Sequence, residues 1–297
     1  MTAFSRTLVA MDLSVMDPKL LEWVGVIDAK FGLQKVYFLH VMPDFNTPKN
    51  VDIEFHTLFS TDYPADEKVR DRLAEDVEKI LGKHAGLDIA IEVREGKPYQ
   101  KVVHLSEAKE VQLLVIGRKK KSEGSGISAR RIARTAKCNV MVIPENSQIG
   151  LKHILVPVDF SELSAKALRT ALDIAGRCPD VKITALYVMD LPPSNYFDKP
   201  YANSGLQKML RDAAHETFSK FLTEFGDKAP FALEEDIIDN TLNNTARHIT
   251  NFALLNGIDL IIMGAQGHSN WENLWFGSVT EKVVETAISP VLVIRGS

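Results

Sequence analysis

Cysteine is scarce in this sequence: the only two, Cys138 and Cys178, stand far apart and form no CxxC or Cys/His spacing. This scarcity argues against a disulfide framework and a cysteine-based zinc site, and it suits a reducing cytoplasm. No stretch approaches the roughly 18 uninterrupted apolar residues of a membrane-spanning helix. We therefore expect a cytoplasmic protein without structural disulfides and without a membrane as partner.

A signal peptide and a strong charge bias are also missing. The amino-terminal apolar run is short and is interrupted by Asp12, so it lacks the apolar core and cleavage site of a leader. The formal net charge is only -4, which gives no general reason to expect nucleic acid as a partner. The basic run at residues 118–121 is the local exception.

Familiar catalytic motifs are absent as well. The chain contains no G-x-x-x-x-G-K-[ST], no H-E-x-x-H and no G-x-S-x-G, which are the signatures of Walker-type nucleotide hydrolases, metalloproteases and serine hydrolases. Its eight histidines are scattered, and none forms an i, i+4 pair that indicates a metal site. We predict no catalytic residues and no metal site of the protein's own.

The sequence does contain an internal repeat of two similar halves. At 297 residues, the chain is about twice a usual domain length. The block "LVAMDLS" matches "LVPVDFS" at an offset of 147, which places Asp12 over Asp159. The same offset aligns "VYFLHVM" with "ITALYVM" and "LLVIG" with "LIIMG". The last pair, "VMVIP" and "VLVIR", needs an offset of 151, so the first half lacks four residues in the preceding loop.

Each half alternates apolar runs with helical patterns, which is typical of a parallel sheet covered on both faces. We predict an α/β protein with two tandem Rossmann-like domains, residues 1–146 and 151–297, each an open parallel sheet of about five strands. The join is the polar segment at residues 144–153. Long inserts follow the second apolar run of each half, ahead of helical patterns at 69–81 and 206–225. These inserts either border a binding crevice or serve as packing flaps.

The most informative stretch is "GAQGHSNWENLWFGSV" in the second half. Gly264 ends an apolar run, Gly267 follows three residues on, and Gly277 precedes a helical pattern. Ser278 and Glu281 have capping-box spacing. Glycine permits positive φ and close approach to a ligand, and the first turn of a helix presents unpaired N–H groups that suit phosphate. The spacing predicts a phosphate-binding loop, with a plain turn as the alternative.

This motif, together with "ILVPVDFSELSAKAL" and "ITALYVMD", closely resembles the universal stress protein family, and the match covers essentially the whole chain twice. The resemblance implies a tandem, UspA-like member with the adenine nucleotide alpha hydrolase type of fold. It also implies ATP bound in the second half by a stress-response regulator. Whether the nucleotide is ATP, ADP or AMP, and whether Mg²⁺ accompanies it, stays open.

Carried onto this sequence, the family pattern implies a nucleotide site in the second half only. Asp159 and Val188 would lie on the adenine and ribose side, although Asp159 alone is equally typical of a helix N-cap or turn. The loop and the start of the following helix would hold the phosphates. The complete set is Pro157, Asp159, Val188, Met263, Gly264, Gly267, His268, Gly277, Ser278 and Val279.

The first half departs from this pattern. Gly117 and Gly126 match two of the glycines, but Lys120 stands at the position of the third, in a shorter loop. We expect a Cβ at a positive-φ position to cost about 1 kcal/mol or more, and the short loop leaves less room for a triphosphate. The first half is therefore predicted to be degenerate for ATP. Its basic run either holds a smaller anion or a partner, or is a solvated loop.

Three functions stay open from sequence. The first is a regulator in which bound ATP stabilises one conformation and so alters the binding of an unknown protein partner. The second is a weak ATPase or autokinase, with Asp159 near Mg²⁺ and Ser278 as phosphoryl acceptor. The third is a nucleotide-free scaffold for a protein or an apolar ligand. The apolar final strands need covering, by internal pairing of the two domains or in a homodimer.

Overall fold

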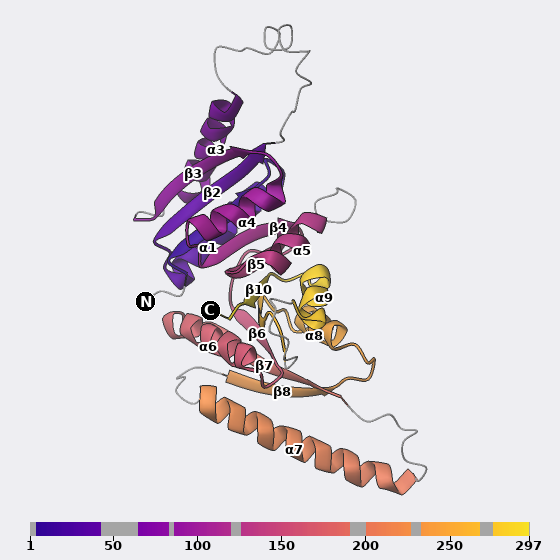
Figure 1. Ribbon diagram of the computed structural model, residues 1–297. Coiled ribbons are helices and arrows are strands. Elements are labelled where there is room, and N and C mark those ends of the chain that lie inside the picture. The colour runs from indigo at the N-terminus through magenta and orange to yellow at the C-terminus, as the bar shows by residue number, and fades with distance from the viewer. Residues whose placement is uncertain are drawn as a thin grey trace, which may run out of the picture. The chain divides into compact units, whose positions relative to one another are not determined.

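The computed structural model describes residues 4–42, 65–82, 86–119, 126–190, 200–226, 233–267 and 276–296. The chain divides into two compact units, Met1–Glu145 and Asn146–Ser297 (Figure 1). Each unit contains five strands in a parallel sheet with helices between them. This architecture confirms the predicted class of two tandem, open parallel-sheet α/β domains.

The first unit consists of β1 (Arg6–Met11), α1 (Asp17–Phe31), β2 (Lys35–Met42), α3 (Ala65–Leu81), β3 (Asp88–Glu95), α4 (Pro98–Ala108), β4 (Leu113–Arg118), α5 (Gly126–Thr135) and β5 (Asn139–Pro144). Its strand order is β3-β2-β1-β4-β5. Helix α1 packs with α3, and α4 packs with α5, because right-handed crossovers put them on opposite faces of the sheet. The order reverses between β1 and β4, where open α/β sheets bind ligands.

The second unit repeats this plan with β6 (His153–Val158), α6 (Glu162–Arg177), β7 (Lys182–Met189), α7 (Pro200–Gly226), β8 (Leu233–Asp239), α8 (Thr245–Leu255), β9 (Leu260–Gly264), α9 (Ser278–Thr286) and β10 (Val291–Ile294). Its strand order is β8-β7-β6-β9-β10. Helices α6 and α7 pack together, as do α8 and α9 (Figure 1). The order reverses between β6 and β9.

Burial explains why the apolar runs form the central strands. The apolar residues of β4 and β9 are all buried, whereas the residues of the outer strands β3 and β8 are mostly exposed or half-buried, and many of them are acidic. Charges on an outer strand discourage pairing with another chain. Asp88 on β3 is one of these charges, and its Oδ2 atom lies 2.7 Å from Nζ of Lys35 on the neighbouring strand β2. The alternation of fully apolar and polar-edged segments in the sequence therefore maps onto sheet position.

Two helices begin earlier than their sequence patterns indicated. Helix α3 begins at Ala65 rather than residue 69, and two acidic residues in its first turn favour the start of a helix. Helix α7 begins at Pro200 rather than residue 206, and proline is well suited to the first helical position. Most of both inserts, residues 43–64 and 191–199, lies outside the described ranges.

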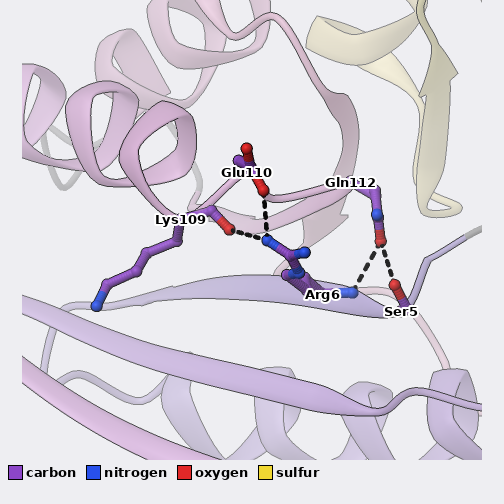
Figure 2. Close-up of polar contacts among 5 residues, drawn as sticks. All are labelled: Ser5, Arg6, Lys109, Glu110 and Gln112. Atoms are coloured by element: carbon purple, nitrogen blue, oxygen red, sulfur yellow. Dashed lines mark hydrogen bonds and ion pairs between the residues drawn. The ribbon is translucent and has the colours of Figure 1, made fainter.

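A polar network ties the amino end of β1 to the turn before β4 (Figure 2). The Oε1 atom of Gln112 accepts from the Ser5 hydroxyl at 2.7 Å and from the Arg6 backbone N–H at 2.9 Å. The Arg6 guanidinium donates to Glu110 at 2.7 Å and to the Lys109 carbonyl at 3.2 Å. These bonds hold the two central strands of the first unit in line at the end opposite the candidate sites.

The turn after the first strand of each unit holds a non-glycine residue in the left-handed region. Leu13 has φ 56° and Phe160, 147 positions later, has φ 65°. In the first unit the two carboxylate oxygens of Asp17 accept from the backbone N–H groups of Asp12 at 3.2 Å and Leu13 at 2.8 Å. Such a conformation persists only where its surroundings enforce it, and the Asp17 carboxylate provides that support.

The Asp17 side chain should make stability depend on pH. Its residue is only 4% exposed, and this burial raises the pKa of Asp17 from 3.8 to about 6, with the neighbouring Asp12 charge adding to the rise. The two backbone hydrogen bonds act in the opposite direction. Between these pKa values the folded state holds a proton that the unfolded state has lost, so stability falls as pH rises through this window.

We compare the free energy of unfolding of the natural chain with that of Asp17→Ser. We predict that the natural chain gains about 2 kcal/mol over the variant when the pH is lowered from 7 to 4. Serine is a suitable replacement because Ser164 stands at the matched position of the second unit. Urea unfolding of both proteins across this range measures the difference. A difference independent of pH would contradict the raised pKa.

Candidate functional site

The two units differ where their strand order reverses. In the first unit, β1 pairs with β4 along Thr7–Ala10. In the second unit, β6 pairs with β9 only at Ile154 and Leu155. Pro157 stands at the position that matches Ala10, and proline has no N–H to donate to a neighbouring strand. The pairing therefore ends two residues earlier in the second unit, at the place where open α/β sheets bind ligands in a crevice.

Asp159 directly follows β6, at one side of this crevice. Its Oδ1 atom accepts from the Ser161 hydroxyl at 2.6 Å and from the Ser161 backbone N–H at 3.1 Å. Ser161 is the N-cap of α6 and accepts from the Ser164 N–H at 3.2 Å. Asp159 therefore does not cap this helix, but its bond to the N–H two residues on makes it a turn residue, which was the other part of that alternative. Its Oδ2 atom lies against Gly267, where an added Cβ would overlap it.

The glycine-bearing loop leaves and re-enters the fold at one point, which we call the neck. At the neck, the Gly277 N–H donates to the Ala265 carbonyl at 2.8 Å, and the Ala265 N–H donates to the Ile294 carbonyl at 2.9 Å. The buried Thr280 hydroxyl donates to the Gly264 carbonyl at 2.8 Å. Two of these bonds fix the end of β9 against the start of α9, and the third fixes it to the end of β10.

Glycine serves close approach at Gly264 and Gly267 rather than a left-handed backbone. None of Gly264, Gly267 and Gly277 has φ in the left-handed region, so the positive φ that we expected is wrong. A Cβ on Gly264 would lie 2.7 Å from Cβ of Leu163 on α6. Glycine at this position lets the helix pack directly on the strand end.

The start of α9 also differs from the capping box that we expected. Gly277 is the N-cap and no side chain caps the helix, whereas side chains of Ser161 and Asn244 cap α6 and α8. Ser278 is the first helical residue, and it is exposed. The first N–H groups of α9 therefore have no side-chain acceptor at the cap. An anion in the loop is a suitable acceptor for them.

Two residues at the base of the loop were missed in the sequence. One is Thr280, which holds the neck. The other is Arg295, only 6% exposed, whose guanidinium lies 5.3 Å from the centroid of the buried Phe276 ring. Lys166 donates to the Arg295 carbonyl at 2.7 Å. The sequence did contain a signal for Arg295, because this charged residue directly follows a fully apolar strand. The matched residue of the first half is the uncharged Pro144.

The other predicted residues fall into three groups. Val188 and Met263 are largely buried in strands, at 8% and 5% exposure. Val188 nevertheless borders Asp159, because its neighbour Tyr187 pairs with the residue before Asp159. Val279 is half-buried in the first turn of α9. His268, like Lys120 of the first half, lies outside the described residues.

Metal binding and membrane spanning find no support in the described ranges. No group of three or more His, Cys, Asp or Glu side chains in those ranges could hold a metal ion. No helix in the same part of the chain is long and apolar enough to cross a bilayer.

Comparisons with known proteins agree with the repeated plan. A model of the universal stress protein family matches residues 3–144 and again residues 150–295. A universal stress protein of Methanocaldococcus jannaschii is 30% identical over 158 residues, which are 52% of this chain and 87% of that protein. The universal stress protein YxiE of Bacillus subtilis is 27% identical over 157 residues, with coverages of 48% and 97%.

One solved structure resembles both units together. The universal stress protein from Archaeoglobus fulgidus covers 98% of this chain and 96% of its own, with a TM-score of 0.58 and 18% identity. At this identity the likeness establishes the fold alone.

Proposed function

The chain belongs to the universal stress protein family as a tandem, two-domain member, and we propose that its second unit binds ATP as a nucleotide-dependent regulator of the stress response. The first unit, in this proposal, does not bind ATP. Bound nucleotide stabilises one conformation of the loop and the segments around it, and partner binding follows from that conformation.

The observation that carries the proposal is the uncapped start of α9 at the neck. The helix end presents N–H groups and the positive end of a helix dipole, with Gly277 as its N-cap and Ser278 adding an exposed hydroxyl. Close packing at Gly264 and Gly267 keeps side-chain bulk out of the loop base. These features together suit a phosphate chain.

Asp159 supports the same proposal from the opposite side of the crevice. A carboxylate accepts hydrogen bonds from the hydroxyls of a ribose. Its Oδ1 atom is engaged by Ser161, while Oδ2 points toward the loop at Gly267. The pairing between β6 and β9 ends before Asp159, and in this proposal the base lies beside it. Val188 and Met263 form the apolar floor at the strand ends.

Mg²⁺ fits this site only as a companion of the nucleotide. Magnesium in nucleotide sites is held mainly by phosphate oxygens and water, with one or two carboxylates. Asp159 is the one proposed site residue with a carboxylate, and Ser161 already donates twice to it. We therefore assign Mg²⁺ no dedicated set of protein ligands.

Denaturing freshly purified protein and quantifying the released nucleotide by mass spectrometry tests the proposal. We expect about one adenine nucleotide per chain, or stoichiometric binding of added ATP if the purified protein is empty. Two per chain would contradict the degenerate first unit. No released nucleotide and no binding of added ATP would overturn the proposal in favour of the scaffold. Steady conversion of ATP to ADP would favour the weak ATPase.

A further inference from the structure

We propose that the first unit binds an uncharged aromatic molecule that carries one N–H or O–H donor. The site is a cavity of about 350 Å³ at the carboxyl ends of β1, β2 and β4. This volume is at the lower end of the range for small-molecule sites, which suits a ligand of one or two rings. The inference is independent of ATP binding in the second unit.

The walls of this cavity are mainly apolar. Among the described residues that line it, three have polar side chains: Asp12, His40 and Lys119. Leu20, Val102 and Ile132 close it from three different helices and are each at most 4% exposed. Two methionines, Met11 and Met16, also line it. Methionine sulfur adapts to irregular shapes and makes favourable contacts with aromatic rings, so the lining favours a ring over a hydrated ligand.

His40 determines which polar group the ligand must carry. The residue is buried, and its Nδ1 atom is 3.1 Å from the Met11 carbonyl oxygen. A carbonyl oxygen only accepts, so Nδ1 carries the proton. In the neutral ring, Nε2 is then an acceptor, and it makes no hydrogen bond with the described residues. A ligand N–H or O–H group supplies the missing donor.

The charges at the mouth of the cavity favour a neutral ligand. Lys119 Nζ is 2.8 Å from Asp12 Oδ2, and the lysine side chain is only 13% exposed. Burial alone would raise the pKa of Asp12, but the hydrogen bond and charge of Lys119 lower it, so the pair is ionised. A phosphate chain would have to compete with Asp12 for this lysine. An uncharged ligand leaves the pair intact.

The second unit does not repeat this arrangement. Tyr187 stands at the position of His40, and its ring centroid is 4.7 Å from that of Phe160. Phe160 also contacts Phe218 and Phe221 of α7 at 6.0 and 5.7 Å. Aromatic side chains of the protein thus pack at the matched position, which makes Tyr187 a natural control for His40.

Calorimetric titration of the full chain with indole and benzofuran tests this proposal. The two probes have the same ring size, but benzofuran has no N–H donor. We expect one indole per chain, bound about fivefold more tightly than benzofuran. His40→Phe should abolish that preference. Ala129 of α5 also lines the cavity, so Ala129→Phe should fill it and remove both probes. Tyr187→Phe should change neither affinity.

Equal affinity for the two probes, no indole binding at millimolar concentration, or loss of indole binding in saturating ATP would each overturn the proposal. The comparison of probes on the natural chain needs no variant, so it decides the matter even if His40→Phe does not fold. Failure of ATP binding to the second unit would leave all of these expectations unchanged.

Discussion

Gly264→Ala is expected to lower the free energy of unfolding of the second unit by about 2–3 kcal/mol. An alanine Cβ would lie 2.7 Å from Cβ of Leu163, and 3.2 Å from both the Leu163 backbone and the Gln266 carbonyl oxygen. These are backbone atoms and one side-chain atom fixed directly to the backbone, so neither the helix nor the loop can give way cheaply. Helix α6 must move away from the end of β9.

Gly117→Ala in the first unit is the matched control, because it lies 147 positions earlier. Its Cβ would meet the terminal methyl of Met16 at 3.0 Å and methyls of Leu20 at 3.7 Å. A flexible methionine end can move aside, so we expect a loss below about 1 kcal/mol. Urea unfolding with hydrogen exchange, which assigns each loss to its unit, measures both. Equal losses would contradict the proposed role of Leu163.

Gly277→Asp is expected to weaken ATP binding about 100-fold or more while leaving α9 folded. Gly277 has φ -63° and ψ 143°, a conformation that aspartate and asparagine adopt readily at an N-cap. The new carboxylate would accept the N–H groups that we assign to phosphate. It would also repel the nucleotide, since two unit charges about 4 Å apart interact by roughly 4 kcal/mol near a protein surface.

Gly277→Asn separates charge from bulk. Both variants add a Cβ that would lie 3.3 Å from the Ala265 carbonyl oxygen, and both supply a capping side chain. We expect the asparagine variant to lose about tenfold or less in ATP affinity, as measured by calorimetry. Equal losses in the two variants would mean that crowding at the neck, rather than charge at the start of α9, controls binding.

The repeat made much of this architecture predictable. Blocks at constant offset located the central strands, and their Val, Ile and Leu content indicated burial on both faces. The residues of the proposed site were chosen with the same alignment, because strand ends and the start of the next helix were visible as changes of pattern. Strand ends meet at one edge of a parallel sheet, so Asp159 and Gly264 were expected at one crevice.

Details that depend on the packing of distant segments could not be predicted. The need for glycine at position 264 arises from Leu163, a hundred residues earlier, and not from local φ. The cap of α9 is Gly277 rather than Ser278 because the neck bonds determine where the helix begins. The cavity beside His40 depends on helices from three parts of the first unit, and no short motif encodes that.

The order of strands has a consequence for how the chain folds as it is synthesised. Thr7 of β1 pairs with Leu113 of β4, so the central strand of the first unit cannot pair with β4 until about a hundred more residues have been synthesised. Such distant parallel pairings form slowly. The five strands of the first unit, β1 to β5, all lie before the second unit begins. The first unit can therefore fold on the ribosome while the second is still being made. This order separates two similarly patterned sets of strands in time and limits mispairing between them.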